Sequence, residues 1–470
     1  MTTTATATEE EVGPVLERFT SWLDGYGEVS RDHQSFFAGP IGGRAKALYY
    51  RHKLLGTAAV APMIFLEAFV PAGRYLFHHP ERFPIADAHY AMGFAFLFEA
   101  TGRSQHLERA VHFLRELQKS RSPHFQEYCW GYPFDWVTRN GTLKAQTPFI
   151  TTTPYAYEAF LQVYEIWRRT EDGDQRSEVR GQRTDDSKAE TLKSEKLTEG
   201  GGRRKSGGKK AEEYKEILAS IARHAATDIK DFPTSEKASS CSYSPFDGGG
   251  VINAAAYRAF LLTSASSLFA RDDYREIADR NLRFVLENQN ADGSWFYAVD
   301  GVRDFVDHFH TCFVLKALAK IHTLTGDAAT LEALTRGVDY YLSNLFAADG
   351  LPKPFSRAPR LTVYKRELYD CAECINLCLL LQDRFPQLQS TLETVVGGIL
   401  RDWIKPDGSF RSRQLKLGWD NVPMHRWAQS QMFRSLAFYF RETKVAARVR
   451  RENVRAQTEL GHAQIISDMA

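Results

Sequence analysis

At 470 residues, with 43% hydrophobic and 13% aromatic residues, the chain is long enough to bury a large core in one ring-shaped domain or in two to three average ones. Its 60 basic and 58 acidic side chains give a net charge of +2, and no basic stripe is interleaved with aromatic residues, which argues against a nucleic-acid partner. Six cysteines, four of them in apolar helical runs, are typical of reduced core residues rather than of a disulfide framework.

The N-terminal part of the sequence does not predict a secretory signal. The opening residues, MTTTATATEEEV, lack the basic and apolar regions of a secretory leader. The longest apolar stretch, GTAAVAPMIFLEAFVPAG, is interrupted by Pro62 and Glu67 and is too short to predict a membrane span. We therefore expect a cytoplasmic protein without stable membrane insertion.

Two kinds of helical pattern alternate along the chain. The first kind is apolar nearly all round and must be buried on most sides, whereas the second has a narrow apolar stripe that would cover a core on one face. Strand patterns are scarce, and the Asn-Gly turn in RNGTL lacks convincing strands on either side. Helices of the first kind are predicted to start near residues 87, 152, 251, 307, 368 and 422.

A recurring turn indicates an internal repeat. The turns NADGSWF, AADGLPKPF and KPDGSF place Asp292, Asp349 and Asp407 at intervals of 57 and 58 residues, which suits two helices and two loops. Six hairpins, each with a buried inner helix and an amphipathic outer helix, predict an all-α (α/α)6 toroid, a barrel of helical hairpins. The N-terminal segment would supply the missing sixth outer helix. An open superhelix of helix pairs is the alternative.

One segment does not fit this pattern. Residues 171–211 are charged, rich in Gly, Ser and Lys, and almost free of large apolar side chains, so they predict a disordered insertion. Its basic run GGGRRKSGGKK would either contact an acidic partner or remain a solvated loop. We therefore expect a single toroid domain over residues 1–443, interrupted by this insertion, and a charged C-terminal tail over residues 444–470.

The predicted ring places polar residues at one rim. All inner helices would run in the same direction, so their N-terminal ends share one face, where unpaired N–H groups favour carboxylates and anionic ligands. Aromatic platforms mixed with charged groups are what a sugar site requires. The candidate substrate-binding residues at this rim are Trp130, Asp135, Trp136, Tyr155, Asp247, Trp295, His308, Glu373, Trp419, Asp420 and Arg426.

The candidate catalytic residues are Asp307, Asp370, His310 and His425. Asp307 and Asp370 begin adjacent inner helices and would serve as the proton donor and base of a glycosidase. His310 or His425, removing a proton beside a sugar carboxylate held by Arg426, would suit a lyase or an epimerase. Plainer interpretations stand beside these: Asp307 and Asp370 as helix N-caps, His308 and His310 as satisfied rim histidines, and Trp295 and Phe410 as loop anchors.

Several motifs resemble a known family. The stretches SWLDGYGE, DGSWFYAVDG, FVDHFHTCFVLKAL, YDCAECINLCLLL and VPMHRWAQSQMFRSLAFYF resemble the VpsJ-type proteins, a bacterial family associated with exopolysaccharide biosynthesis. The resemblance leaves out the first dozen residues, the insertion and the tail. The helix-pair period also looks like the broader six-hairpin superfamily of glycosidases, unsaturated glucuronyl hydrolases and sugar 2-epimerases. This resemblance implies cytoplasmic residence and a polysaccharide gene neighbourhood, and it assigns no catalytic residue. Phe309 stands where Asn or Tyr was expected.

A metal site is a further possibility. Cys371 and Cys374 lie three residues apart, and HFHTC adds His308, His310 and Cys312, all of them zinc-binding types. Some α/α toroids, including protein prenyltransferase β subunits and lanthionine cyclases, use zinc at this rim. The cysteines fall in apolar runs, however, and no second closely spaced pair exists. We therefore favour core cysteines and expect neither a metal nor a cofactor.

The sequence thus predicts a carbohydrate-active protein of bacterial polysaccharide biosynthesis or processing. Its partner would be a polysaccharide, an oligosaccharide or a sugar precursor bound in the central cavity, with general acid/base chemistry of glycoside hydrolase, lyase or epimerase type. One alternative is a non-catalytic glycan-binding or scaffold protein, with other polysaccharide-biosynthesis proteins as partners. The other alternative is a zinc-dependent toroid transferase or cyclase.

Overall fold

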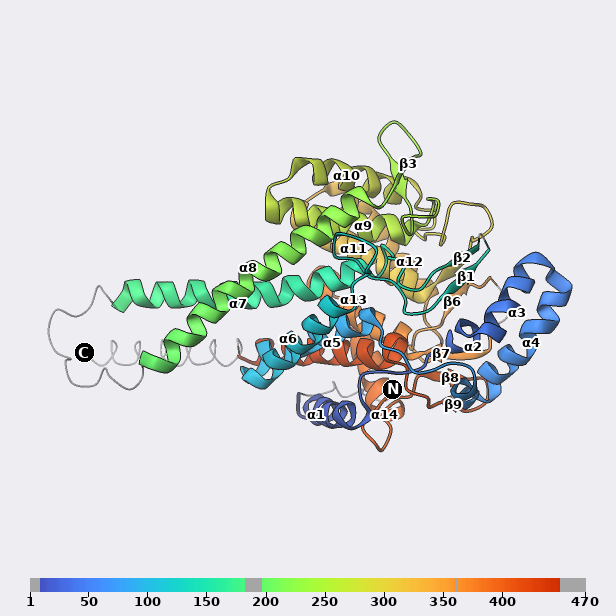
Figure 1. Cartoon of the computed structure of the whole chain (residues 1–470), viewed down its shortest axis with the longest axis horizontal. Helices are drawn as coiled ribbons and strands as arrows, with labels where there is room; N and C mark the ends of the chain where they lie inside the picture. The colour runs from blue at the N-terminus through green and yellow to red at the C-terminus, as the bar shows by residue number, and fades with distance from the viewer. Residues whose placement is uncertain (1–8, 140, 182–196, 360–361, 449–470) are drawn as a thin grey trace, which may run out of the picture.

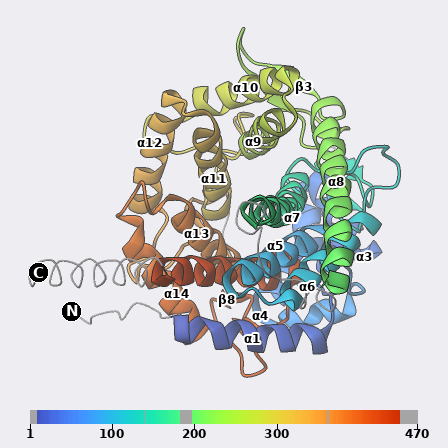
Figure 2. The ribbon, with the colours of Figure 1, turned by 90° about the vertical axis from the view of Figure 1, so that its left-hand side faces the viewer.

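A computed structural model describes residues 9–139, 141–181, 197–359 and 362–448, which form a closed ring of helical hairpins (Figures 1 and 2). The inner helices are α5 (Pro84–Thr101), α7 (Thr153–Gly181), α9 (Ile252–Phe269), α11 (His308–Thr325), α13 (Leu368–Leu381) and a sixth over residues 430–448, which the π-helical turn η2 (His425–Gln429) precedes. The outer helices are α1 (Glu9–Tyr26), α6 (Ser104–Lys119), α8 (Leu197–Thr227), α10 (Asp272–Glu287), α12 (Ala328–Asn344) and α14 (Leu388–Asp402). The predicted (α/α)6 toroid is confirmed.

Apolar composition separates the inner helices from the outer ones. In α9, every residue from Ile252 to Ala265 is buried, so the helix is surrounded on all sides. Its outer partner α10 buries a stripe that includes Tyr274, Ala278 and Leu282, spaced four residues apart, and exposes the opposite face. The two sequence patterns therefore correspond to two positions in the ring. The first five inner helices begin within three residues of their expected starts, whereas the sixth begins at residue 430, after η2, instead of near 422.

The N-terminal helix α1 closes the ring. The ring of Phe19 stacks on Phe433 of the sixth inner helix at 5.1 Å and lies 6.4 Å from the ring of Tyr90 on α5. A Cβ added at Gly13 would lie 3.4 Å from the ring of Phe440. The first and last hairpins are thus packed together through α1, and the alternative of an open superhelix is wrong.

The Asp-Gly turns show the same closure. Gly293 has a φ of +90°, and a Cβ there would lie 2.4 Å from the carbonyl oxygen of Arg336 on α12, the next outer helix. Gly408 also has a φ of +90°, and a Cβ there would lie 2.7 Å from the carbonyl oxygen of Arg18 on α1. Only glycine combines a left-handed conformation with such a close backbone approach. The helix α1 therefore occupies the place of the outer helix that follows α14.

Short antiparallel strands connect the loops at one end of the ring. They are β1 (Trp136–Thr138), β2 (Gly141–Leu143), β3 (Asp231–Pro233), β4 (Ser239–Cys241), β5 (Val306–Asp307), β6 (Phe355–Arg357), β7 (Tyr364–Glu367), β8 (Arg413–Leu415) and β9 (Trp419–Asp420). Strand β5 pairs with β6, and β7 pairs with β8, so the loops that lead into successive inner helices are joined. The expectation for RNGTL was wrong, because β1 and β2 form a hairpin with Thr138 opposite Gly141.

A helical hairpin outside the ring was not predicted. It comprises α2 (Ser35–Ala38), α3 (Pro40–Arg51), α4 (Lys53–Phe69) and the 3₁₀ helix η1 (Pro71–Leu76), and it projects at the end of the molecule where β1, β2 and β7–β9 lie (Figure 1). Three buried ion pairs join this segment to the sixth hairpin, each with a shortest N–O distance of 2.6 Å: Asp32–Arg426, Glu67–Arg413 and Arg74–Asp420.

The expected insertion contains helix at both ends. Residues 171–181 continue α7 and residues 197–211 begin α8, and these two long helices extend beyond the ring (Figure 1). Residues 182–196 lie outside the described residues, as does the part of the expected tail after residue 448. Within the described ranges, no helix has both the length and the apolar character needed to cross a membrane.

Candidate functional site

Three inner helices bring aromatic side chains together at the rim. Phe309 of α11, Tyr369 of α13 and Trp427 of η2 lie with ring centroids 4.8 to 5.7 Å apart. Successive members of this trio are 60 and 58 positions apart along the chain, yet their rings meet at one place on the rim, which we call the mouth. The predicted convergence of inner-helix starts is therefore observed for these three helices. The aromatic Phe309, unexpected from the family resemblance, is part of this wall.

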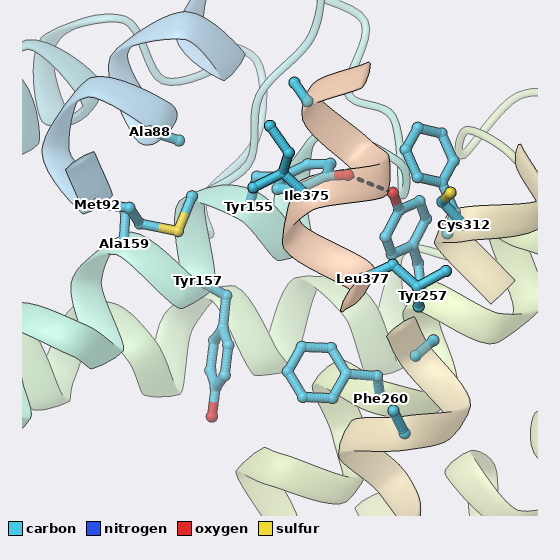
Figure 3. Packing of buried hydrophobic residues seen from close by; sticks show 14 of the residues in the cluster. Ala88, Met92, Tyr155, Tyr157, Ala159, Tyr257, Phe260, Cys312, Ile375 and Leu377 are labelled. Carbon is cyan, nitrogen blue, oxygen red and sulfur yellow. Dashed lines mark hydrogen bonds between the residues drawn. The ribbon is translucent and has the colours of Figure 1, made fainter. Parts of the chain in front are cut away.

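A second aromatic layer lies deeper along the axis. The hydroxyl groups of Tyr155 on α7 and Tyr257 on α9 are 2.6 Å apart and point toward each other (Figure 3). The ring of Phe313 on α11 lies 5.2 Å from that of Tyr257. Tyr155, predicted as a substrate-binding residue, therefore belongs to a buried layer beneath the mouth.

Buried ion pairs occupy the axis at the level of this second layer and below it. Glu373 of α13 pairs with Lys316 of α11, and Glu158 of α7 pairs with Lys320 of α11. Burial lowers the pKa of Lys320 to about 8 although the Glu158 carboxylate opposes this shift. Removal of either member of such a pair would leave the other as a buried charge without a partner, which is strongly destabilising. Glu373, another predicted binding residue, pairs with Lys316 through Oε2, while its buried Oε1 has no hydrogen-bond partner among the described residues.

Asp307 and His310 form the first polar unit of the mouth. Asp307 is the N-cap of α11, and its Oδ1 accepts the backbone N–H of His310 at 3.0 Å. Its Oδ2 accepts a hydrogen bond from Nδ1 of His310 at 2.6 Å. Nδ1 thereby carries a proton, and Nε2 is the ring nitrogen that this hydrogen bond leaves free. The His310 side chain remains 20% exposed.

Asp370 is a second acid near the Asp307–His310 pair, and it lines neither of the two cavities described below. It lies in the first turn of α13, is buried, and neither carboxyl oxygen has a hydrogen-bond partner among the described residues. Burial raises its pKa well above the ordinary value, and the nearby carboxylates of Glu367 and Asp307 raise it further. The surroundings of Asp370 thus favour a protonated carboxyl beside a hydrogen-bonded one.

Glu367 completes this acidic group and was not predicted. It immediately precedes α13 and pairs with Arg413 at 2.7 Å, and Arg413 also pairs with Glu67 of α4. The position of Glu367, directly before an all-round apolar helix, is the same signal that pointed to Asp307. Glu158, Lys316 and Lys320 could also have been found, because each is a charged residue inside an apolar helix.

One small cavity adjoins the Asp307–His310 pair, and a larger one lies next to it. The smaller, of about 10 Å³, is lined by both residues and by Asn253. A space of this size holds about one water molecule. The larger, of about 400 Å³, shares Ile252 and Phe296 with the smaller one. Its polar wall includes Glu287, Asn288, Gln289, Asn290 and Asp304. The larger cavity has the size of a small-molecule site.

Two predicted histidines face away from the mouth. The ring of His425 is buried beneath α1, where Nε2 donates to the carbonyl oxygen of Gly27 at 3.0 Å and Nδ1 lies 2.5 Å from the hydroxyl of Tyr90. His308 donates from Nδ1 to the carbonyl oxygen of Leu345 at 3.2 Å. Burial lowers the pKa of His425 to about 4 and that of His308 to about 3. Both are satisfied core histidines; the plainer interpretation had covered His308, whereas His425 had been predicted as a catalytic residue.

Three of the predicted tryptophans also lie away from the mouth. The indole N–H of Trp130 donates to Leu117 at 2.8 Å, and that of Trp295 donates to Val285 at 2.9 Å, in both cases to a backbone carbonyl. These two side chains are buried and anchor rim loops to the outer helices. Trp419 packs against Trp403 at 4.9 Å on the outer side of the rim. The expected role of Trp295 as a loop anchor agrees with this geometry.

The remaining predicted aspartates have local partners. Asp135 pairs with Lys144 at 2.9 Å and accepts the backbone N–H of Ala145. Asp247 accepts the N–H groups of Tyr243 and Ser244, which shapes the loop before α9. Asp420 is buried against Arg74, as described above. None of these three carboxylates joins the Asp307 and Asp370 group.

Trp136 and Arg426 lie among the rim aromatic residues. The ring of Trp136 lies 5.3 Å from Tyr132 and from Phe149, in the loop region before α7. The guanidinium carbon of Arg426 lies 4.6 Å from the ring of Tyr132 and 4.9 Å from that of Trp427. Its ion pair with Asp32 fixes Arg426 in this position, where cation–π contacts add to the attraction.

The cysteines proposed as zinc ligands are core residues. The thiol of Cys312 lies 3.6 Å from the hydroxyl of Tyr341, and the sulfur atoms of Cys374 and Cys378 are 3.9 Å apart. Burial raises the pKa of Cys371 and Cys374 well above the ordinary value, which disfavours the thiolate that zinc requires. In the described parts of the chain, no three His, Cys, Asp or Glu side chains are arranged to hold a metal ion.

Comparisons with known proteins identify the fold. An unsaturated glucuronyl hydrolase specific for heparin matches with a TM-score of 0.53 and 10% identity over 92% of this chain and 96% of that one. A possible member of the GH105 family from Salmonella enterica matches with a TM-score of 0.54 and 12% identity, over 93% and 96%. Cellobiose 2-epimerase from Bacillus thermoamylovorans matches with a TM-score of 0.52 and 9% identity, over 78% and 90%. No protein-family model matches the sequence, and neither does any curated protein. The chain has the α/α-toroid fold of six-hairpin glycosidase-like proteins.

Proposed function

We propose that this chain is a carbohydrate-active enzyme that binds a polysaccharide, an oligosaccharide or a sugar precursor at the rim of the toroid. The observation that carries this proposal is the pairing of two different carboxyl groups at the mouth. Asp370 is buried without a hydrogen-bond partner among the described residues, whereas both oxygens of Asp307 are hydrogen-bonded to His310. Environments that push the pKa values of neighbouring acids apart are typical of general acid/base sites.

In a hydrolytic reaction, Asp370 would act as the proton donor. Its raised pKa keeps a proton available at neutral pH, and that proton would pass to the oxygen of the leaving sugar. Asp307 would assist a water molecule on the other side of the bond. Phe309, Tyr369 and Trp427 would provide apolar faces for a sugar ring. The hydrolases among the structures of the same fold support this reaction class.

An epimerase or lyase reaction is favoured by a separate observation. The Asp307 carboxylate orients the imidazole of His310, so that Nε2 is available to remove a proton from a sugar carbon. His310 also lines the small cavity beside the mouth. The fold shared with a cellobiose 2-epimerase supports this version. Arg426, proposed from the sequence to hold a sugar carboxylate, pairs through Nε with Asp32, and its Nη2 has no hydrogen-bond partner among the described residues.

A non-catalytic glycan-binding role is favoured by the size of the space beside Asp307. The small cavity there, of about 10 Å³, is too small for a sugar ring, whereas the neighbouring cavity of about 400 Å³ has room for one. A protein that only binds glycans would use the larger cavity and leave the carboxyl pair unused. The further context, bacterial polysaccharide biosynthesis in the cytoplasm, is a proposal that rests on the sequence resemblance.

Turnover measurements on the full chain test the proposal. Purified protein is incubated with oligosaccharides that include cellobiose and unsaturated uronides, and the products are followed by chromatography and by deuterium uptake from solvent. New reducing ends indicate hydrolysis, whereas deuterium at a sugar carbon without cleavage indicates epimerisation. We expect Asp370→Asn to abolish the reaction and Asp273→Asn, a first-turn aspartate of outer helix α10, to leave it unchanged. Equal turnover by wild type and Asp370→Asn would contradict the proposal.

A further inference from the structure

The hairpin of α3 and α4 exposes an unusual amount of apolar surface. Of seventeen large hydrophobic side chains that are exposed in the described parts of the chain, nine lie between residues 41 and 76. They include Leu54 and Leu76, which are 88% and 87% exposed, and Phe65, which is 59% exposed. Scattered exposed apolar residues are ordinary, but such a concentration marks an interaction surface.

The exposed residues of α4 follow one face of the helix. Leu54, Ala58, Ala61, Phe65 and Phe69 are spaced by three or four positions and are all exposed. This spacing places them in a single stripe along the helix. An amphipathic helix normally turns such a stripe toward a core, but here the stripe faces away from the protein.

The opposite face of α4 holds the hairpin together. Met63 packs with Phe36 and Ala45 in a small core that is separate from the core of the ring. A Cβ added at Gly56 would lie 2.0 Å from the Cα of Tyr49, so α3 and α4 are in close backbone contact. The contacts that stabilise the hairpin therefore come from its other face, and the exposed stripe is not needed for them.

The charges around the stripe are all positive. No Asp or Glu occurs between Asp32 and Glu67, whereas four Lys and Arg residues do. Arg44, Arg51 and Lys53 are exposed, and none has a carboxylate partner among the residues that the structure describes. A surface that combines an apolar stripe with unpaired cations is complementary to an anionic lipid surface.

We propose that the α3–α4 hairpin docks on the surface of a bilayer that contains anionic lipids. Leu54, Phe65 and Phe69 would enter the boundary between headgroups and acyl chains, while Arg44 and Arg51 would contact anionic headgroups. The helix lies in the plane of the surface and does not cross it, since α4 has 17 residues and contains Pro62. A protein partner or a second copy of the chain would need an apolar groove bordered by acidic groups. An anionic bilayer provides an apolar interior beneath a negatively charged surface.

Docking would also orient the ring. Buried ion pairs tie the hairpin segment to the loops of the sixth hairpin, so the two move together. The hairpin projects at the rim end of the molecule (Figure 1). A docked protein therefore holds its mouth toward the membrane surface. The docking itself is independent of the reaction proposed for the mouth.

Vesicle flotation with the full chain tests this proposal. Vesicles of phosphatidylcholine alone are compared with vesicles of equal parts phosphatidylcholine and phosphatidylglycerol, at low and at high salt. We expect flotation only with the anionic vesicles, and weaker flotation at high salt because the cations are screened. The double variant L54S/F65S and the double variant R44Q/R51Q should each reduce bound protein by about tenfold.

Two controls make the result decisive. The variant V302S/L324S removes exposed apolar side chains from other surfaces and should float like the wild type. Circular dichroism and thermal melting should be the same for all variants, because every substituted residue is exposed. Absence of flotation, or equal flotation of L54S/F65S and the wild type, overturns the proposal. So does a dimer of the wild type, detected by light scattering, that L54S/F65S dissociates, because a second copy would then cover the stripe.

Discussion

Asp307 binds His310 twice, through Oδ1 to its backbone N–H at 3.0 Å and through Oδ2 to its ring Nδ1 at 2.6 Å. The capping and the functional interpretations of this aspartate are therefore compatible. One oxygen stabilises the start of α11, and the other fixes the tautomer and the orientation of a partly exposed imidazole. The same side chain can be tested for each role separately.

Substitutions at Asp307 should separate stability from activity. Asparagine is also a good N-cap, so Asp307→Asn should leave the melting temperature nearly unchanged while it reduces turnover, because the imidazole loses its anionic partner. Asp307→Ala should additionally lower the free energy of unfolding by about 1 kcal/mol. Thermal melting and turnover of both variants are the measurements. A large fall in stability for Asp307→Asn, with turnover retained, would assign the residue a capping role alone.

Asp370 should make stability depend on pH. Its pKa in the folded chain is raised above the unfolded value of about 3.9, so its favourable contribution is complete below that value and is lost as the pH rises through the folded pKa. Asp370→Asn removes this loss. We therefore expect the variant to gain stability relative to the wild type as the pH increases, measured by urea unfolding at acidic, neutral and alkaline pH. A constant difference between the two proteins would show that Asp370 does not titrate in this way.

His425 should contribute to acid denaturation. Its folded pKa of about 4 lies below the unfolded value of about 6.5, so its contribution is present above pH 6.5 or so and is lost as the pH falls toward 4. The maximum slope for one such group is about 1.4 kcal/mol per pH unit. In His425→Gln, the free energy of unfolding should fall less steeply over this range. Unchanged slopes in guanidinium unfolding would argue against a neutral buried His425.

Ring closure by α1 should be measurable as stability. Phe19 is fully buried and stacks on Phe410 at 5.0 Å and on Phe433 at 5.1 Å. Phe19→Ala should therefore lower the free energy of unfolding by about 3–5 kcal/mol. Val29→Ala, at an exposed position after α1, serves as the control and should change it little. Similar unfolding curves for the two variants would mean that α1 is not an integral part of the ring.

Trp136 should contribute to glycan affinity. Its ring is partly exposed and lies beside Tyr132 and Phe149. Trp136→Ala should weaken binding by about tenfold, since an aromatic face in a binding site is worth about 1–2 kcal/mol. Trp419→Ala is the matched control, because that indole lies on the outer side of the rim. Calorimetric titration with an oligosaccharide selected on a glycan array is the measurement, and equal losses in both variants would show that Trp136 has no particular role.

The helix pairs could be predicted from the sequence because burial imposes a periodicity on every helix. The all-round apolar pattern of CINLCLLL and the striped pattern of AATLEALTRG are local signals of long-range position. The α3–α4 hairpin could not be predicted as a unit, because its apolar residues face outward and its anchors are single ion pairs such as Arg74–Asp420, 346 residues apart.

The candidate site was only partly predictable for a similar reason. A helix start fixes the end of the ring at which a residue lies, but not the direction of its side chain. His310 and His425 both stand at inner-helix starts, yet the first lies at the mouth and the second lies under α1. That difference depends on packing between segments hundreds of residues apart, and the sequence around each histidine does not record it.

The most direct test of the account is a crystal structure of the chain soaked with an oligosaccharide that it binds on a glycan array. The account predicts sugar density at the mouth, with polar atoms within hydrogen-bonding distance of Asp370 or of the Asp307–His310 pair. Sugar density confined to another surface of the protein would contradict it.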